Sequence, residues 1–137
     1  MTFKLDKRLQ DDCFVLGRME FSRVLLMNNA AVPWFVLVPN TQETEIFDLP
    51  STERAMLWDE VDRMAEYMRH DPSIEKLNIA AIGNVVSQLH VHIVGRRQDD
   101  YCWPDVVWGR PSEETYTDVA VAEIVKSVAD HIEVFVP

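Results

Sequence analysis

The sequence predicts an α+β domain in which antiparallel hairpins alternate with helices. Short runs of β-branched and apolar residues, bounded by Asn, Pro or Gly, are typical of strands. Two longer segments instead repeat apolar residues at helical spacing. The chain has 137 residues, of which 47% are hydrophobic, so it is long enough for one domain with a core of its own. We therefore expect a single domain over residues 1–137.

The N-terminal part is expected to form one hairpin. Residues 3–19 mix charges with scattered apolar side chains and predict a short helix or an extended arm. Residues 23–28 and 34–38 read as the two strands of a hairpin with a longer loop. Residues 28–33 form its turn, because Asn tolerates turn geometry and Pro cannot continue a central strand.

A long amphipathic helix is expected from Ser51, a plausible N-cap, to about Arg69. Its predicted core stripe is Leu57, Val61, Met64 and Met68, widened by Trp58 and Ala65. The charged residues expected to face away are Arg54, Asp59, Glu60, Asp62 and Arg63. The sequence His70-Asp71-Pro72 ends the helix, and His70 is expected to be exposed there.

The second half predicts two more strands and a last helix. Residues 77–82 and 87–95 read as strands joined by a turn at Gly83-Asn84. An aromatic segment follows, for which a loop packed over the core or across a subunit boundary is favoured over a platform that stacks a base. Thr117 is expected to cap the last helix, which ends near an exposed His131. Residues 134–136 add an edge to the sheet or dock on a partner.

The strongest functional signal is the segment Gln88-Leu89-His90-Val91-His92, which holds two of the four histidines. Because strand side chains alternate between faces, Gln88, His90 and His92 are expected to share one face. Imidazole suits proton transfer and nucleophilic attack near neutral pH. Two other interpretations remain open for these residues alone. The histidines can occupy a solvent face by chance, or form half of a metal site.

The surrounding residues resemble the histidine triad (HIT) family, whose signature is His-φ-His-φ-His-φ-φ with φ apolar. His90 and His92 match the second and third signature histidines, the apolar spacers match, and Gln88 replaces the first histidine. The resemblance extends upstream and covers about residues 20–97, through the segments Phe35-Val36-Leu37-Val38-Pro39, Asp48-Leu49-Pro50 and Lys76-Leu77-Asn78-Ile79-Ala80-Ala81-Ile82-Gly83-Asn84. Residues 98–137 then supply the aromatic loop and the C-terminal helix.

The resemblance implies a HIT-like fold, an antiparallel sheet of about five strands with one main amphipathic helix and a C-terminal helix. It also implies a nucleotide phosphoanhydride or phosphoramidate hydrolase, or a nucleotidyl transferase. His90 would attack the α-phosphorus and carry the nucleotide covalently, and His92 would contact the phosphate or the bridging oxygen. No metal and no other cofactor is required.

The same resemblance assigns further residues. Asn84 and Ser87 would offer donors to phosphate oxygens, and Asn28 or Asn29 would bind the ribose, although turn geometry explains an Asn there equally well. Trp34 stands where many members carry a histidine that extends the relay from the first triad position. Because Gln88 and Trp34 both remove groups from that relay, we expect activity that is retained but slow.

Composition limits the partners. A net charge of −10 argues against binding to nucleic acid or to an anionic membrane, and the longest apolar runs are too short to span a bilayer. We expect a cytoplasmic homodimer, with two free cysteines, that binds a purine nucleotide or a dinucleoside polyphosphate. The alternatives are a nucleotide-binding module with little turnover and a divalent-metal site on His90 and His92, with Asp99, Asp100 or Cys102 near enough in sequence to join.

Overall fold

A five-stranded antiparallel sheet forms the centre of the structure, a computed structural model that describes residues 3–137. The strand order is β1-β2-β3-β5-β4, and every neighbouring pair is antiparallel. The strands are β1 (Cys13–Arg18), β2 (Ser22–Met27), β3 (Trp34–Pro39), β4 (Lys76–Ala80) and β5 (Val91–Arg96). The expected α+β class and the antiparallel sheet of about five strands are confirmed.

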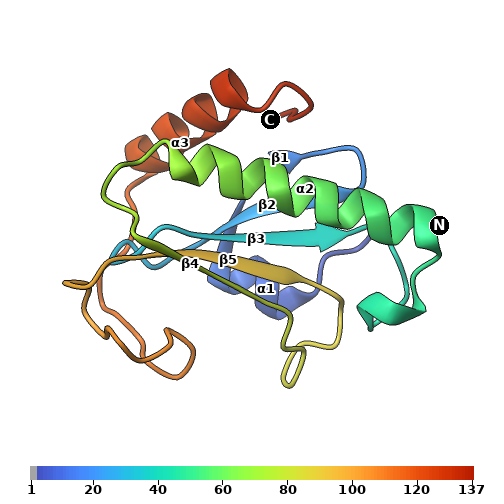
Figure 1. Cartoon of the computed structure of the whole chain (residues 1–137), viewed down its shortest axis with the longest axis horizontal. Coiled ribbons are helices and arrows are strands. Elements are labelled where there is room, and N and C mark those ends of the chain that lie inside the picture. The colour runs from blue at the N-terminus through green and yellow to red at the C-terminus, as the bar shows by residue number, and fades with distance from the viewer. Residues whose placement is uncertain (1–2) are drawn as a thin grey trace.

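Both faces of this sheet are covered, by different parts of the chain (Figure 1). Helices α2 (Ser51–Arg69) and α3 (Asp118–His131) lie on one face. The short helix α1 (Lys7–Asp12) and the loop that follows β5 lie on the other. Strands β3 and β5 are therefore buried at every position, which explains the continuously apolar sequence of β3, whereas β5 buries His92 and Arg96 as well.

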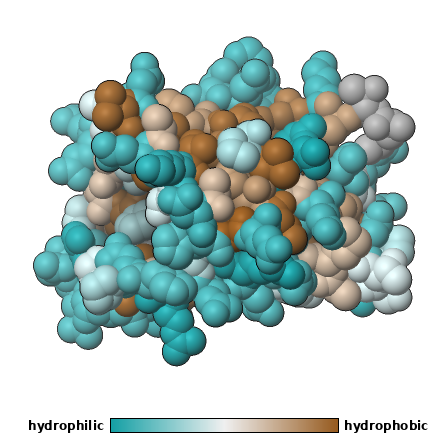
Figure 2. All heavy atoms as spheres, turned by 90° about the horizontal axis from the view of Figure 1, so that it is seen from above, coloured by the Kyte–Doolittle hydropathy of each residue, from teal (hydrophilic) through white to brown (hydrophobic). Residues whose placement is uncertain are grey.

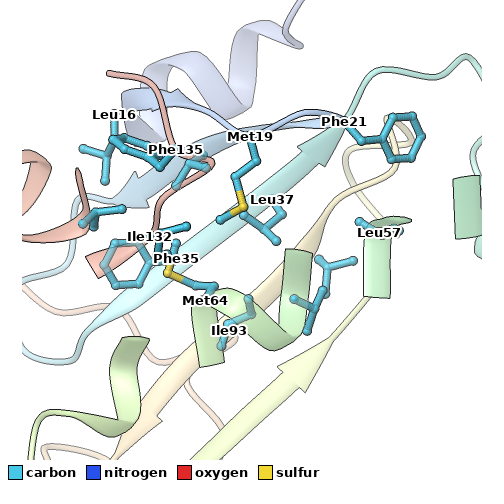
Figure 3. Packing of buried hydrophobic residues seen from close by; sticks show 14 of the residues in the cluster. Leu16, Met19, Phe21, Phe35, Leu37, Leu57, Met64, Ile93, Ile132 and Phe135 are labelled. Atoms are coloured by element: carbon cyan, nitrogen blue, oxygen red, sulfur yellow. The ribbon is translucent and has the colours of Figure 1, made fainter. Parts of the chain in front are cut away.

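The main core lies between the sheet and the two long helices. Leu57 and Met64 of α2 point toward Phe35, Leu37 and Ile93 of the sheet (Figure 3). A second cluster on the opposite face joins Val36 and Val94 to residues of α1 and the C-terminal loop, namely Leu9, Cys102 and Val107. Alternate residues of β3 and β5 thus contribute to two separate cores.

Helix α2 has the expected bounds and buries the expected stripe of Leu57, Val61, Met64 and Met68. Three expectations about it were wrong. Pro50 rather than Ser51 is the N-cap, and it makes no side-chain capping bond. Trp58 is 43% exposed, whereas Glu60 is only 4% exposed because its carboxylate accepts a 2.8 Å hydrogen bond from the backbone N–H of Phe21. Burial raises the pKa of Glu60.

The C-terminal part follows the prediction more closely. Thr117 caps α3, and its hydroxyl accepts from the backbone N–H of Ala120. Beyond α3, the chain returns to the sheet, where Val136 pairs with Arg18 at the outer edge of β1 through two 2.8 Å backbone hydrogen bonds. Gly17 permits this approach, because a Cβ there would overlap the Val136 carbonyl oxygen. Residues 134–136 therefore add to the sheet of their own chain.

Two strands differ from the prediction. The segment expected as helix or arm contains α1 but also β1, a short strand interrupted by Gly17 and preceded directly by the charged residues of α1. Strand β5 begins at Val91, so residues 87–90 are an extended approach to it. Across residues 3–137, the helices are all too short or too polar to cross a bilayer.

Candidate active site

The two histidines of the motif lie side by side on the sheet face opposite α2 and α3. His92 belongs to β5 and pairs with Val36 of β3 and Ala80 of β4, and His90 immediately precedes the strand. Their ring centroids are 4.8 Å apart, which is closer than the spacing of about 7 Å between alternate strand residues. The residues are 6% and 5% exposed, so the rings are held in place by their surroundings.

The hydrogen bonds of His90 fix where its proton resides. Its Nδ1 lies 2.7 Å from the backbone carbonyl oxygen of Gln88. A carbonyl oxygen can only accept, so Nδ1 carries the proton and donates it. The Nε2 of neutral His90 therefore keeps its lone pair, which is the electron pair that a nucleophile or base needs.

His92 has the opposite arrangement. The indole Nε1 of Trp34, which can only donate, lies 3.0 Å from Nδ1 of His92. The proton of neutral His92 therefore resides on Nε2. Burial, with a smaller contribution from nearby His90, lowers the pKa of His92 to about 3. His92 is thus a neutral hydrogen-bond donor at physiological pH, and the pair presents one free acceptor and one free donor.

Two tryptophans enclose His92. The rings of Trp34 and Trp108 stand edge-on to the imidazole at 5.8 and 5.3 Å, and they contact each other at 5.8 Å. Trp108 comes from the aromatic loop and packs against the second core cluster, which agrees with the favoured expectation of a loop packed over the core. Nothing in the residues around Trp108 indicates that its ring contacts a histidine.

Gln88 makes two hydrogen bonds that the sequence did not predict. Its side-chain Oε1 accepts from the backbone N–H of Asp6 at 2.7 Å, and its Nε2 donates to the carbonyl of Lys4 at 3.0 Å. The side-chain amide of Gln88 therefore anchors the backbone of Lys4 and Asp6 with one accepted and one donated hydrogen bond. Gln88 also lines the cavity that His90 lines.

A cavity of about 460 Å³ opens beside the histidine segment. It is bounded by Gly83, Ser87, Gln88 and His90 on one side and by α2 and the preceding turn on the other. That second wall contains Phe47, Arg54 and Trp58. Arg54 and Trp58 are residues that sequence reasoning assigned to the solvent face and the core stripe. The signal for this wall that the sequence does contain is an Arg and a Trp one helical turn apart, Arg54 and Trp58.

Comparison with known proteins identifies the chain's relatives. A model of the HIT domain matches residues 8–99. The chain belongs to the HIT family. Among solved structures it is similar to a histidine triad protein of Marinobacter aquaeolei, with 36% identity, a TM-score of 0.90 and 96% of each chain covered. It is also similar to one of Bradyrhizobium japonicum, with 36% identity, a TM-score of 0.89, and 94% of this chain and 97% of that chain covered.

A third similar structure is the HIT protein of Sinorhizobium meliloti, with 35% identity, a TM-score of 0.90, and 95% of this chain and 97% of that chain covered. No curated protein matches the chain. The fold and the family are thereby established, and HIT domain proteins generally bind or hydrolyse nucleotides.

The asparagines that the HIT resemblance assigned to the substrate do not line the cavity beside His90. The Oδ1 of Asn28 accepts from the backbone N–H of Tyr116, and the Oδ1 of Asn29 accepts from that of Ala31. Both amides therefore organise the turn after β2, and neither residue borders the cavity beside His90. Asn84 is exposed and also lies outside the cavity lining, whereas its neighbour Gly83 belongs to it.

The residues suggested to complete a metal site in this HIT domain are engaged in other contacts. Asp100 accepts from Nε and Nη2 of Arg96 at 2.8 and 3.0 Å, and both side chains are at most 2% exposed. This ion pair holds the pKa of Asp100 down at about 2. Asp99 pairs with Arg97 at the surface. Within residues 3–137, no three His, Cys, Asp or Glu side chains form a ligand set.

Proposed function

We propose that this HIT protein hydrolyses or transfers the nucleotidyl group of a phosphoanhydride or phosphoramidate through a covalent intermediate on His90. The observation that carries the proposal is the pair of opposite tautomers. The Gln88 carbonyl leaves a lone pair on Nε2 of His90, and Trp34 leaves a proton on Nε2 of His92. A nucleophile and a neutral donor 4.8 Å apart match the charge changes of phosphoryl transfer.

The proposed reaction has two balanced steps. First, Nε2 of His90 bonds to the α-phosphorus while the bond from phosphorus to the leaving group breaks. The leaving group departs with that electron pair and takes up a proton. Water then bonds to the same phosphorus, the phosphorus–nitrogen bond breaks, and a nucleoside monophosphate and a proton are released. Throughout, the Nε2–H of His92 donates to a phosphate or bridging oxygen, and with a pKa of about 3 it stays neutral.

The cavity beside His90 supports a purine nucleotide or a dinucleoside polyphosphate as the substrate. Trp58 and Phe47 offer exposed aromatic surface on which a base can stack, being 43% and 73% exposed. Arg54 brings a guanidinium to the same wall, where its Nη2 donates to the carbonyls of Phe47 and Leu49. In a chain of net charge −10, a fixed local cation is what a phosphate group requires.

The test is rapid quenching with a labelled adenosine phosphoramidate or diadenosine polyphosphate, followed by mass spectrometry of the peptide that contains His90. We expect a nucleotidyl adduct on that residue in the wild type. His90→Ala is expected to abolish both the adduct and turnover while the circular dichroism spectrum stays unchanged. His70→Gln, which changes an exposed histidine far along the chain, is the matched control. Undiminished turnover in His90→Ala would exclude His90 as the nucleophile.

A nucleotide-binding module with little turnover is the second candidate function. The observation that favours it is that Gln88 and Trp34, which replace relay histidines, are both tied into structural hydrogen bonds. Binding of AMP by the wild type, with no cleavage across a panel of nucleotide derivatives, would select this candidate over the hydrolase.

We also propose that two copies associate through β4. The outer edge of β1 is paired with Val136 at Arg18, whereas β4 is the last strand on the other side of the sheet. Its Ile79 is 44% exposed, and Trp58 of α2 is exposed as well. An edge strand with free backbone groups and apolar side chains favours antiparallel pairing with a second copy. Ile82, just beyond β4, lines the cavity, so such a partner would lie close to the proposed site.

A further inference from the structure

A second cavity lies between the sheet and the two long helices, near the C-terminal end of α2. Its volume is about 440 Å³, and Phe35, Tyr67 and Ile124 are among the side chains that line it. His70, at the end of α2, and His131, the last residue of α3, also border it and are exposed to solvent. Figure 2 shows hydrophobic residues exposed among hydrophilic ones on this helical side of the molecule.

His70 and His131 are close neighbours with the same protonation pattern. Their ring centroids are 5.4 Å apart. The Nδ1 of His70 lies 3.0 Å from the carbonyl oxygen of Glu66, and the Nδ1 of His131 lies 2.8 Å from that of Ser127. Since carbonyl oxygens only accept, both Nδ1 atoms carry protons and both Nε2 atoms keep lone pairs. This pattern is the usual support of a metal-binding imidazole, whose other nitrogen donates to a carbonyl.

The spacing of the two rings fits a shared ion. With metal–nitrogen distances of about 2.0–2.1 Å and a tetrahedral angle, two imidazoles on one ion have centroids about 5 Å apart. The observed 5.4 Å is close to that value. His90 and His92 are also close, but Trp34 places the proton of His92 on Nε2, so that pair offers only one free lone pair.

The local electrostatics favour a cation between His70 and His131. Both residues stand at helix C-termini, where unpaired carbonyls carry partial negative charge. Asp71 borders the same cavity, and both of its hydrogen bonds, to the N–H and the hydroxyl of Ser73, use Oδ1 alone. The chain as a whole carries a net charge of −10.

The two helices are already held together at this point. The hydroxyl of Tyr67 on α2 donates to that of Ser127 on α3 at 2.9 Å, and the Tyr67 ring contacts the ring of His131 at 5.6 Å. The imidazoles therefore need little rearrangement to converge on an ion.

We propose that Nε2 of His70 and Nε2 of His131 together bind a divalent transition-metal ion such as Zn²⁺, Co²⁺ or Ni²⁺, linking the end of α2 to the end of α3. The described residues 3–137 supply no third ligand of the His, Cys, Asp or Glu type in coordinating position, so water completes the coordination. The site is separate from the proposed nucleotide site, because the two cavities share no lining residue.

The test uses the full chain and the metal alone. Calorimetric titration with ZnCl₂ is expected to show one ion per chain, and Co²⁺ is expected to give visible d–d absorption. His70→Gln and His131→Gln should each weaken binding by about tenfold or more, since each removes one of two ligands. Both residues are exposed, and Gln can still donate to the helix carbonyl, so these variants are expected to fold.

His90→Asn and His92→Asn are the controls, and they are expected to leave the zinc affinity within twofold of the wild type. The proposal is overturned if the double variant of His70 and His131 binds zinc as the wild type does. It is also overturned if the wild type binds no zinc at millimolar concentration, or if the controls rather than His70→Gln abolish binding. None of these outcomes depends on nucleotide turnover, so failure here is distinct from failure of the proposed function.

Discussion

The indole Nε1 of Trp34 donates a hydrogen bond to Nδ1 of His92, and this contact sets the proton of His92 on the nitrogen that faces away from the tryptophan. The two residues come from neighbouring strands, Trp34 at the start of β3 and His92 inside β5. A tryptophan at this position is therefore more than the loss of a relay histidine. It supplies a permanent donor that imidazole itself provides in only some of its protonation states.

Replacing Trp34 with Phe is expected to destabilise the protein and to slow the proposed reaction. The variant leaves the buried Nδ1 of His92 without its donor, which costs about 1–3 kcal/mol in the free energy of unfolding. Urea denaturation measures the stability and kcat measures the reaction. Trp108→Phe is the matched control, because Trp108 contacts the same imidazole but its buried Nε1 has no hydrogen-bond partner. Equal losses in the two variants would contradict the role of the Trp34 hydrogen bond.

The low pKa of His92 predicts a specific pH dependence of stability. Its folded-state pKa of about 3 lies below the ordinary value of 6.5, so between these values the unfolded chain binds more protons than the folded protein. The free energy of unfolding therefore rises with pH across this window, by up to about 1.4 kcal/mol per pH unit. The contribution is complete above about pH 6.5 and is lost as the pH falls toward 3.

This dependence is measured as the slope of the unfolding free energy between about pH 4 and pH 6. His92→Gln is expected to flatten that slope relative to the wild type, because it removes the group whose pKa is lowered on folding. Titration of the His92 ring signals by NMR in the pH range of an ordinary histidine would count against the proposed neutral donor.

Gln88→Ala is expected to release the N-terminal segment from the approach to β5. Two hydrogen bonds disappear, one to the N–H of Asp6 and one to the carbonyl of Lys4, each contributing about 1 kcal/mol. Hydrogen exchange at the Asp6 amide should accelerate several-fold, a change that is read directly by NMR. Gln88→Glu keeps the acceptor for the Asp6 N–H and loses the donor to Lys4. The exchange rate of the Asp6 amide in this variant is expected to lie between those of the wild type and Gln88→Ala. An unchanged Asp6 rate in Gln88→Ala would mean that other contacts hold this segment.

Ile79→Lys is expected to convert the proposed dimer into a monomer, because it places a charge on the exposed edge of β4. Light scattering coupled to size-exclusion chromatography gives the mass directly. Val15→Lys is the matched control, since Val15 is 53% exposed on β1 at the other side of the sheet. A monomeric wild type, or loss of the dimer in Val15→Lys alone, would contradict association through β4.

Regular patterns were readable in the sequence. The apolar spacing from Leu57 to Met68 predicted both the bounds and the buried face of α2, because a helix that packs on a sheet needs one continuous stripe. The alternation around His90 and His92 placed both rings on one face for the same kind of reason. Thr117 was recognisable as a cap because its hydroxyl satisfies a free helical N–H wherever it stands.

The errors arose where long-range contacts decide a side chain's role. Gln88 interacts with residues more than 80 positions away, and Glu60 is buried by a backbone N–H that lies 39 positions before it. The sequence around Gln88 or Glu60 therefore gives no indication of these partners. The position of Arg54 and Trp58 beside the histidine segment likewise depends on how α2 is placed over the sheet. The tautomer of His92 could not be predicted for the same reason, because it depends on Trp34, which lies 58 positions before it.

The return of the C-terminus onto β1 limits how this protein can grow by self-association. With Val136 hydrogen-bonded to Arg18, the end of the β1 edge is covered by the protein's own chain, which hinders pairing with another molecule there. Strand addition is then favoured at the opposite edge, formed by β4. A two-fold axis beside β4 pairs that edge with its copy and gives a closed dimer. A chain trimmed before Val134 would have two usable margins, and it would be prone to open-ended fibres instead of a finite assembly.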